Sequence, residues 1–290
     1  MPVSEFESTS RGSRGKAGTK NQEDDEVKLF ISCNDHDTLL LFSDRGVAYA
    51  LPAYRVPMSS RTAKGTPAVQ LLPIPREEQI TSLVSVESFD NEYYLLMLTK
   101  SGFIKRTPLS AFSKIRSNGL IAINLEVGDA LTWVRLSTEG DSVLIGSSRG
   151  MTIHFRLDFN ELRPLGRTAR GVKSMNLKNG DKLVSMDVLT SDLVDQLAKL
   201  DEQDDTYDDE LENNSSKGPW VLVASAFGLG KRVPVTQFRL QKRAGMGLRA
   251  IKFRIKDDVL VGLKVLGEGE ELLFVTEKGV IVRTNADKIS

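Results

Sequence analysis

A run of cations and glycines near the start of the chain has the clearest potential for chemistry. Residues 9–20 contain the cations Arg11, Arg14, Lys16 and Lys20 together with three glycines, and they include no carboxylate and no large apolar side chain. A guanidinium group can hold a phosphate through two parallel hydrogen bonds, and glycine lets the backbone approach a partner closely. The run therefore suits a polyanionic partner, although one such run taken alone is equally typical of a solvated loop.

Weaker versions of this basic, glycine-containing loop recur along the chain, each leading into a segment of alternating apolar and polar residues. The loop glycines are Gly65, Gly119, Gly171 and Gly247. The cations of these loops that we predict to bind the same polyanion are Arg61, Lys64, Arg116, Arg167, Arg170, Lys173, Arg243 and Arg249. Repetition at a fixed phase would set such cations at intervals along one rim, which a single solvated loop would not do.

The elements that must position these loops are five similar segments, each with an apolar run, a turn ending in glycine and a second apolar run. Apolar flanks around a glycine that supplies positive φ are typical of β-hairpins. Two of these hairpins are followed by the basic pairs Lys105–Arg106 and Lys231–Arg232, which we also predict to bind the polyanion. The turn glycines are Gly46, Gly102, Gly150, Gly228 and Gly279.

The repeat predicts the fold. Acidic or Gly-Asp turns, such as Gly128–Asp129, precede a further alternating strand, so each repeat of roughly 50 residues supplies about four strands. We therefore expect an all-β, propeller-like pinwheel of roughly 50-residue, four-stranded blades, forming a single domain over residues 1–290. The phase at the two ends predicts four complete blades and two half blades. Because the half blades are complementary in phase, a closed ring of five blades is the alternative to a fragment of a larger domain.

The formal net charge is zero, but it conceals an acidic insert at residues 191–216. This insert has ten carboxylates and one lysine, so the remaining residues carry the compensating positive charge. A basic body favours an anionic partner. We expect the insert to be disordered, beginning with a short amphipathic turn. It either competes with the anionic partner for the rim or is only a solvated insertion.

No catalytic or metal-binding constellation is visible in the sequence. With one cysteine, Cys33, and the two histidines His36 and His154, a zinc site of Cys and His has too few ligands. The Gly15–Lys16 pair is followed by alanine, so the opening loop is not a phosphate-binding loop of the nucleotide-hydrolase type. No apolar run is long enough to span a bilayer and no secretory signal is present, which favours a cytoplasmic location.

The glycine-spaced loops and the strand pattern together resemble the C-terminal domain of bacterial DNA gyrase A, over essentially the whole chain. The marker of that family is a seven-residue box, Gln-Arg-Arg-Gly-Gly-Lys-Gly. Three of its positions are identical here, Arg14 replaces its lysine, and the remaining three positions differ, so the box is degenerate. The matching residues are Thr9, Ser10, Arg11, Gly12, Ser13, Arg14 and Gly15.

The resemblance implies a β-pinwheel whose basic rim wraps double-stranded DNA and so supports ATP-dependent negative supercoiling. Its partners would be the rest of gyrase A, together with gyrase B, in an A2B2 heterotetramer. ATP and Mg²⁺ would bind other domains, and no cofactor is expected in this chain. The family's DNA-cleaving tyrosine lies in a region absent here, and it is matched by none of Tyr49, Tyr54, Tyr93, Tyr94 and Tyr207. The resemblance implies that the whole enzyme is an isomerase, a DNA topoisomerase, of which this chain would hold neither the catalytic tyrosine nor the ATPase site.

Two alternatives remain open from the sequence. One is the related C-terminal domain of topoisomerase IV, carried by its gyrase A-like protein, which lacks an intact box. The partial box at residues 9–15 favours gyrase over this alternative. The other, from a different class, is a propeller used for protein–protein contact, whose rim need not be basic.

Overall fold

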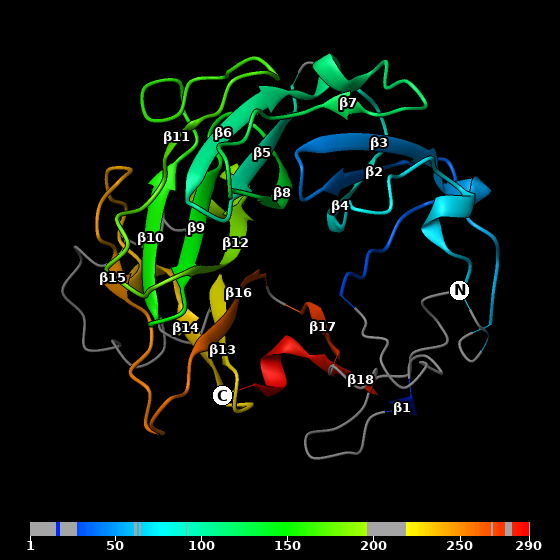
Figure 1. The fold of residues 1–290 in the computed structure, drawn as a ribbon. Helices are drawn as coiled ribbons and strands as arrows, with labels where there is room; N and C mark the ends of the chain where they lie inside the picture. Colours follow the sequence, from blue (N-terminus) through cyan, green and yellow to red (C-terminus); the bar gives the residue numbers. More distant parts are fainter. Residues whose placement is uncertain are drawn as a thin grey trace.

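The computed structural model describes residues 16–17, 28–60, 63, 65–90, 92–195, 219–267, 269–275 and 280–289. These residues form five antiparallel sheets of short strands, joined by single 3-10 turns and by one short helix at 191–195. Figure 1 shows the sheets arranged around a common centre, as blades of a propeller are. The predicted all-β, propeller-like fold is confirmed.

Each sheet is built on one of the predicted hairpins. Their four described turn glycines, Gly46, Gly102, Gly150 and Gly228, have φ between 76° and 89°, a conformation that glycine adopts without steric cost. The hairpins are β2 (Thr38–Ser43) with β3 (Val47–Pro52), β5 (Tyr94–Thr99) with β6 (Phe103–Pro108), β9 (Ser142–Ser147) with β10 (Met151–Arg156), β13 (Trp220–Ser225) with β14 (Gly230–Pro234), and β17 (Glu271–Val275) with β18 (Val280–Asn285).

A third strand pairs with the first strand of four hairpins and lies toward the centre of the molecule. Each pairing carries a register shift beside the hairpin turn. Neighbouring strands of this set contact each other from blade to blade, which places them on the inner side. They are β4 (Ile80–Val86), β8 (Leu131–Ser137), β12 (Leu183–Leu189) and β16 (Leu260–Leu266).

The acidic turns connect the inner strands to the hairpin turns. In three blades an aspartate just before the inner strand accepts a hydrogen bond from the backbone N–H of the residue preceding the turn glycine, at 2.8 to 3.2 Å. Burial alone would raise the pKa of Asp181, but hydrogen bonds from Ser147, Ser148 and two backbone N–H groups lower it. The donor and acceptor pairs are Ser101 with Asp129, Arg149 with Asp181, and Phe227 with Asp258.

The hydrophobic cores lie between adjacent blades, because successive side chains of a strand point to opposite faces of its sheet. In β5, Leu95 and Met97 belong to the core shared with β2, whereas Leu96 and Leu98 belong to the core shared with β9. A third core joins β9 to β13 in the same way, through Leu144. The central strands are therefore buried on both faces, which explains their continuous apolar runs.

The fourth, outer strand of a blade is exchanged between repeats. It is a two-residue strand that directly follows a loop glycine, and it pairs with the hairpin of the preceding repeat. These strands are β7 (Leu120–Ile121) on β3, β11 (Val172–Lys173) on β6 and β15 (Leu248–Arg249) on β10. In these three cases a repeat completes the blade before its own.

Among the described residues, two sheets have three strands, β14-β13-β16 and β1-β18-β17. In the second, β1 (Lys16–Ala17) from the start of the chain is the outer strand of the last hairpin, with Lys16 opposite Ile281. Figure 1 shows β1 beside β18. The count of four complete and two half blades stays a prediction, because residues 1–15 and 18–27 lie outside the described ones, as does the acidic insert beyond residue 195.

Candidate nucleic-acid interface

The basic loops are held at the outer edge of the blades by their glycines. A Cβ added at Gly119, Gly171 or Gly247 would lie 2.6 to 2.7 Å from an atom of the preceding hairpin, and each glycine has φ between 77° and 100°. Only glycine allows this approach without strain. Gly65 differs, because nothing lies within 4 Å of a Cβ built on it.

The same backbone hydrogen bond fixes each of these three loops. The third residue after the loop glycine donates its N–H to the carbonyl oxygen of the hairpin glycine, at 2.8 Å in every case. Since the contact is repeated in successive blades, it brings the loops to equivalent positions along the outer edge. The pairs are Ala122 with Gly46, Ser174 with Gly102 and Ala250 with Gly150.

An arginine four residues before the loop glycine links one loop to the previous loop. Arg167 Nη1 donates to the carbonyl of Ile121 at 3.2 Å, and Arg243 Nη1 donates to the carbonyl of Lys173 at 2.7 Å. The two acceptors occupy the same position, two residues after a loop glycine. The sequence repeats this spacing in Arg11–Gly15 and Arg61–Gly65, so the spacing is visible in the sequence although its structural role is not.

Other predicted cations on these loops are free to meet a partner. Arg116, Lys173 and Arg249 are exposed. Lys173 and Arg249 share one position, each in the second residue of an outer strand. Arg170 is exposed too, stacks over the ring of Phe103 at 4.5 Å and pairs with Glu126. An exposed ion pair of this kind contributes little stability, so its guanidinium can exchange partners at low cost.

The pair Lys105–Arg106 is buried, which the sequence did not reveal. Lys105 Nζ donates to the carbonyls of Gly166 and Arg167 at 3.0 and 2.6 Å. Burial, with Arg167 as a second cause, lowers the pKa of Lys105 to about 7. Arg106 donates from Nε to the carbonyl of Leu162 at 2.5 Å, and its guanidinium lies over a tyrosine ring. Because both side chains are fully buried, they do not belong to the interface.

The second pair, Lys231–Arg232, is placed differently. Lys231 is exposed, while Arg232 is partly buried over the ring of Trp220 at 4.9 Å and forms an ion pair with Asp287 at 3.3 Å. Lys231 therefore remains a candidate for anion binding, whereas the guanidinium of Arg232 already contacts Asp287 and Trp220.

Several predicted residues cannot be placed. Only the backbone of Lys16, in β1, is described among the cations of the opening run. The box residues Thr9 to Gly15, and with them Arg11 and Arg14, lie outside the described residues. The same holds for Lys20, Arg61 and Lys64.

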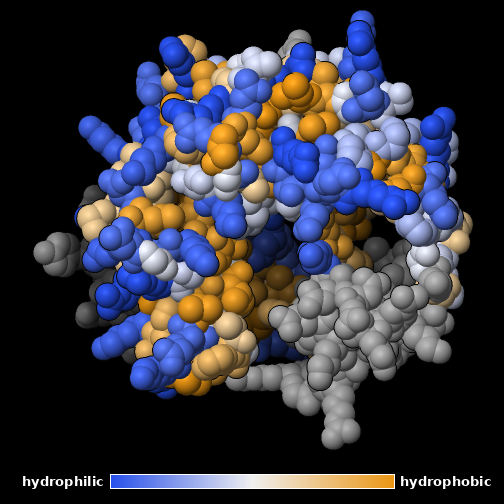
Figure 2. Space-filling view, viewed as in Figure 1, coloured by the Kyte–Doolittle hydropathy of each residue, from blue (hydrophilic) through white to orange (hydrophobic). Residues whose placement is uncertain are grey.

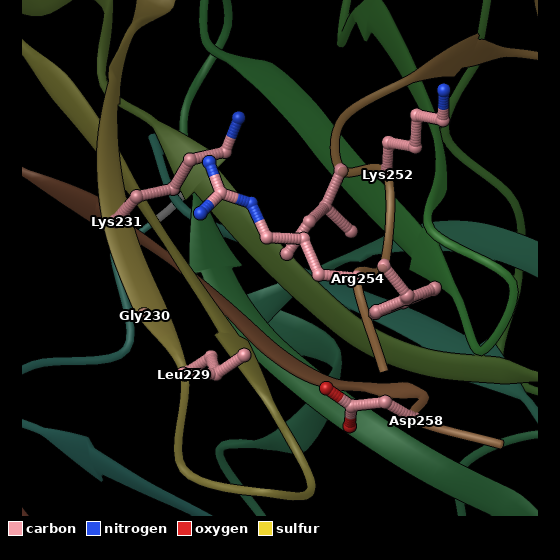
Figure 3. A pocket seen from close by; sticks show the side chains of 8 residues that line it. Leu229, Gly230, Lys231, Lys252, Arg254 and Asp258 are labelled. Atoms are coloured by element: carbon pink, nitrogen blue, oxygen red, sulfur yellow. The ribbon is translucent and has the colours of Figure 1, made fainter. Parts of the chain in front are cut away.

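Sequence reasoning also missed two cations. Lys252 and Arg254 are exposed and line a pocket of ≈ 910 Å³ together with Lys231, beside the start of β14 (Figure 3). The sequence feature that could have identified them is their position as polar residues in the alternating segment after Gly247. In the wider view, hydrophilic side chains project along the outer margin of the molecule (Figure 2).

The described residues contain no group of three or more His, Cys, Asp and Glu side chains that could hold a metal ion. His154, the more central histidine, is buried and contacts Ser142 and the carbonyl of Phe238 at 2.8 and 2.6 Å. Among the helices that the structure describes, none is long and apolar enough to cross a membrane.

A set of antiparallel, mostly four-stranded blades around one centre, with inter-blade cores, defines a β-propeller-like domain. The family model described as DNA gyrase C-terminal domain, beta-propeller, matches residues 1–34, 37–87, 93–138, 141–190, 219–266 and 270–290. The chain belongs to this family.

Individual relatives agree with this assignment. The chain is 55% identical over 296 residues to the DNA gyrase A protein of Synechocystis sp., covering 100% of this chain and 34% of the relative. It is 39% identical over 298 residues to the chloroplastic/mitochondrial DNA gyrase A protein of Arabidopsis thaliana, covering 100% of this chain and 30% of that relative. The chain thus spans about a third of the length of the curated relatives it matches.

Two solved structures have the same fold. The structure of a DNA gyrase A C-terminal domain superposes with a TM-score of 0.78 at 25% identity, covering 99% of this chain and 85% of that one. The C-terminal domain of a DNA topoisomerase IV superposes with a TM-score of 0.68 at 26% identity, covering 88% and 72%. Because the family model and both of these sequence relatives are gyrase proteins, the gyrase assignment takes precedence over topoisomerase IV.

Proposed function

We propose that the chain is the DNA-wrapping module of a gyrase A protein. One observation carries the proposal: the glycine loops repeat at equivalent positions on the outer edges of successive blades. Each loop therefore presents its exposed cations, such as Lys173 and Arg249, at an equivalent position on the outer strand of a blade. A duplex bent along this edge would meet cations at each blade.

Phosphate contacts of this kind hold a duplex in place but do not read its bases. Binding is then largely independent of sequence and steeply dependent on salt, since each neutralised phosphate releases counterions. Smooth bending of a site of 20–30 base pairs costs of order 1–6 kcal/mol, so contacts from several blades are needed to offset it. A rim repeated over many loops meets that requirement, whereas a single basic patch would not.

In the whole enzyme, the wrapped segment would be presented to the DNA-cleaving part of gyrase A, which supports ATP-dependent negative supercoiling. The partners we propose are duplex DNA, the rest of gyrase A, and gyrase B in an A2B2 assembly, acting in the cytoplasm. ATP and Mg²⁺ would bind elsewhere in that assembly, and no cofactor is proposed for this chain.

The test is DNA binding as a function of salt, with linear duplex and with relaxed circles that are then closed on the protein. The variant Arg116→Ala/Lys173→Ala/Arg249→Ala removes three exposed loop cations. If all three contact phosphates, the slope of log K against log salt becomes shallower by roughly 3. The shift in topoisomer distribution should be lost with it.

A charge-matched control keeps this experiment specific. Arg76→Ala/Lys100→Ala/Lys182→Ala also removes three exposed cations, but from turns between strands. It should retain the wild-type salt slope to within one phosphate contact. Equal losses in both variants would mean that net charge, and not the repeated loops, determines binding, and the wrapping proposal would be abandoned.

A further inference from the structure

The two arginines that link neighbouring loops, Arg167 and Arg243, differ in placement from the other loop cations. Both are partly buried, whereas Lys173 and Arg249 on the outer strands are exposed. The guanidinium of Arg243 donates from Nε to the carbonyl of Glu161 at 3.1 Å and from Nη1 to the carbonyl of Lys173 at 2.7 Å. Because a planar guanidinium carries several donors in fixed directions, one arginine can join two separate segments in this way.

Both segments that Arg243 joins are also bound to β6. One is the segment 157–162, of which two carbonyls accept from Arg106 on β6, at 2.5 and 2.8 Å. The other is β11, which pairs with β6 and places Lys173 opposite Phe103. Arg243 therefore closes a circuit of contacts that runs from β6 to segment 157–162, on to Arg243, and back to β6 through β11.

The backbone beside Arg243 continues the same contact. Ala244 N–H donates to the carbonyl of Ser174 at 2.8 Å, and Asn176 N–H donates to the carbonyl of Gly245 at 2.8 Å. The loop of one repeat thus runs along the strand of the repeat before it. The outer strand β11 is held by β6 and also by the loop of the next repeat.

Arg167 makes the equivalent link one repeat earlier. Its Nη1 donates to the carbonyl of Ile121 in β7 at 3.2 Å, and its own carbonyl accepts from Lys105 Nζ at 2.6 Å. The strands β7, β11 and β15 lie along the outer margin of the molecule (Figure 1). The loops that lead into these three strands therefore form a series, in which an arginine of the later loop holds the strand of the earlier one.

We propose that Arg167 and Arg243 are positioning residues for DNA, each fixing the outer strand of the preceding loop so that the cations of that loop meet the duplex already oriented. For Arg243 the positioned cation is Lys173, whose own carbonyl it binds. For Arg167 it is Arg116, which is exposed on the loop that leads into β7. A contact that is oriented before binding loses less conformational entropy when the partner arrives. The inference rests on the DNA-wrapping proposal, and it replaces the phosphate contact that the spacing of these two arginines predicts.

The experiment is a double-mutant cycle on the affinity for a short linear duplex. Arg243→Ala should weaken binding about fivefold in the wild-type background and less than about twofold in the Lys173→Ala background, because the cation that it positions is then missing. A phosphate contact of its own would cost the same factor in both backgrounds, which would overturn the proposal. The matched control is Arg249→Ala, which removes an exposed cation from the same loop. Its loss should multiply with that of Lys173→Ala.

A lysine at position 243 separates positioning from charge. Arg243→Lys keeps the positive charge that a phosphate contact requires, but a single ammonium group does not replace the two donor atoms that reach Glu161 and Lys173. Arg243→Lys should therefore weaken DNA binding about as much as Arg243→Ala does. Wild-type affinity in the lysine variant would overturn the proposal.

Hydrogen exchange of the free protein tests the contact without DNA. The N–H of Ser174 donates to the carbonyl of Gly102 at 2.8 Å, directly after the strand that Arg243 holds. Arg243→Ala should speed its exchange several fold, while Arg249→Ala should leave it unchanged. Unaltered exchange of the buried β5 amides shows that each variant remains folded.

The two measurements distinguish a failure of the positioning role from a failure of the DNA-wrapping proposal. Wild-type exchange of Ser174 in Arg243→Ala would overturn the positioning role, even if DNA affinity falls. A wild-type chain that does not bind DNA would overturn the wrapping proposal and, with it, the role of the arginines toward DNA. Faster exchange in Arg243→Ala would in that case still establish the contact between the loops.

Discussion

The blades of β6 and β14 show how one short sequence acquires two environments. Lys105–Arg106 and Lys231–Arg232 occupy the same register, and each arginine lies over an aromatic ring at a similar distance, 4.7 Å for Tyr94 and 4.9 Å for Trp220. An exchanged loop covers β6 and buries its pair. No described loop covers β14, and Lys231 stays exposed. A basic pair is thus either buried in the fold or accessible to a partner, depending on whether a loop covers it.

The largest effect that would test this comparison concerns the two arginines. Arg106→Ala should lower the free energy of unfolding by about 3 kcal/mol or more, because it leaves the carbonyls of Leu157 and Leu162 without donors. Arg232→Ala should cost about 1 kcal/mol, since Asp287, its partner in the ion pair, is largely exposed. Urea denaturation of both variants measures the difference. Equal losses would mean that the covering loop is irrelevant to the role of the arginine.

A smaller effect separates loops that are packed on a hairpin from one that is not. Gly171→Ala should destabilise the fold by roughly 1–3 kcal/mol, because its Cβ would lie 2.6 Å from the carbonyl oxygen of Ile104 and its φ is +100°. Gly65→Ala meets no atom within 4 Å and should be neutral or slightly stabilising. Thermal unfolding of the two variants decides between them. If Gly65→Ala is as damaging as Gly171→Ala, residue 65 is packed as tightly as its counterpart.

A difference in pH dependence between the wild type and a Lys105 variant isolates the contribution of the buried lysine. Lys105 has a pKa of about 7 when folded and 10.5 as an unperturbed side chain. Between these values the unfolded chain binds more protons, so stability rises with pH, by up to about 1.4 kcal/mol per pH unit. Lys105→Met should abolish that rise, which is measured as the difference in unfolding free energy from the wild type between pH 7 and 9. A constant difference over that range would contradict the buried, readily deprotonated lysine.

The smallest expected effect comes from the acidic insert, which precedes β13 in the sequence. Deletion of residues 200–216 removes eight carboxylates but retains the described residues 191–195. If the insert competes with DNA, affinity at low salt should rise a few fold, and the gain should fade as salt screens it. Fluorescence anisotropy with a labelled duplex measures both. Unchanged affinity at low salt would leave the insert as a solvated insertion.

Much of this fold could be predicted from local sequence. The turn glycines at 46, 102, 150 and 228 require positive φ, and their apolar flanks predict hairpins directly. The exchange of outer strands could not be predicted. A two-residue strand such as β7 is too short to show a period, and its partner is chosen by packing of Gly119 against another repeat.

The positions of the candidate cations were predictable only in part, because tertiary contacts between repeats decide which of them are exposed. Lys173 and Arg249 are exposed, so their predicted role in anion binding stays a prediction, while Lys105 and Arg106 are buried by a loop some 60 residues further along the chain. Arg167 and Arg243 share the spacing of the other loop cations, yet their guanidinium groups bind neighbouring loops. Spacing locates a cation on a loop, but tertiary contacts decide what its head group meets.

Because outer strands are exchanged, one repeat of the sequence does not coincide with one blade of the structure. A duplicated repeat supplies the outer strand of the hairpin before it and leaves its own hairpin to be completed by the next repeat. Insertion or loss of a whole repeat therefore produces the same contact between neighbouring blades. Blade number can therefore drift in evolution without redesign of any interface between blades. The short pairing of β1 with β18 is the junction that must then adapt, because it joins the first described strand of the chain to the last.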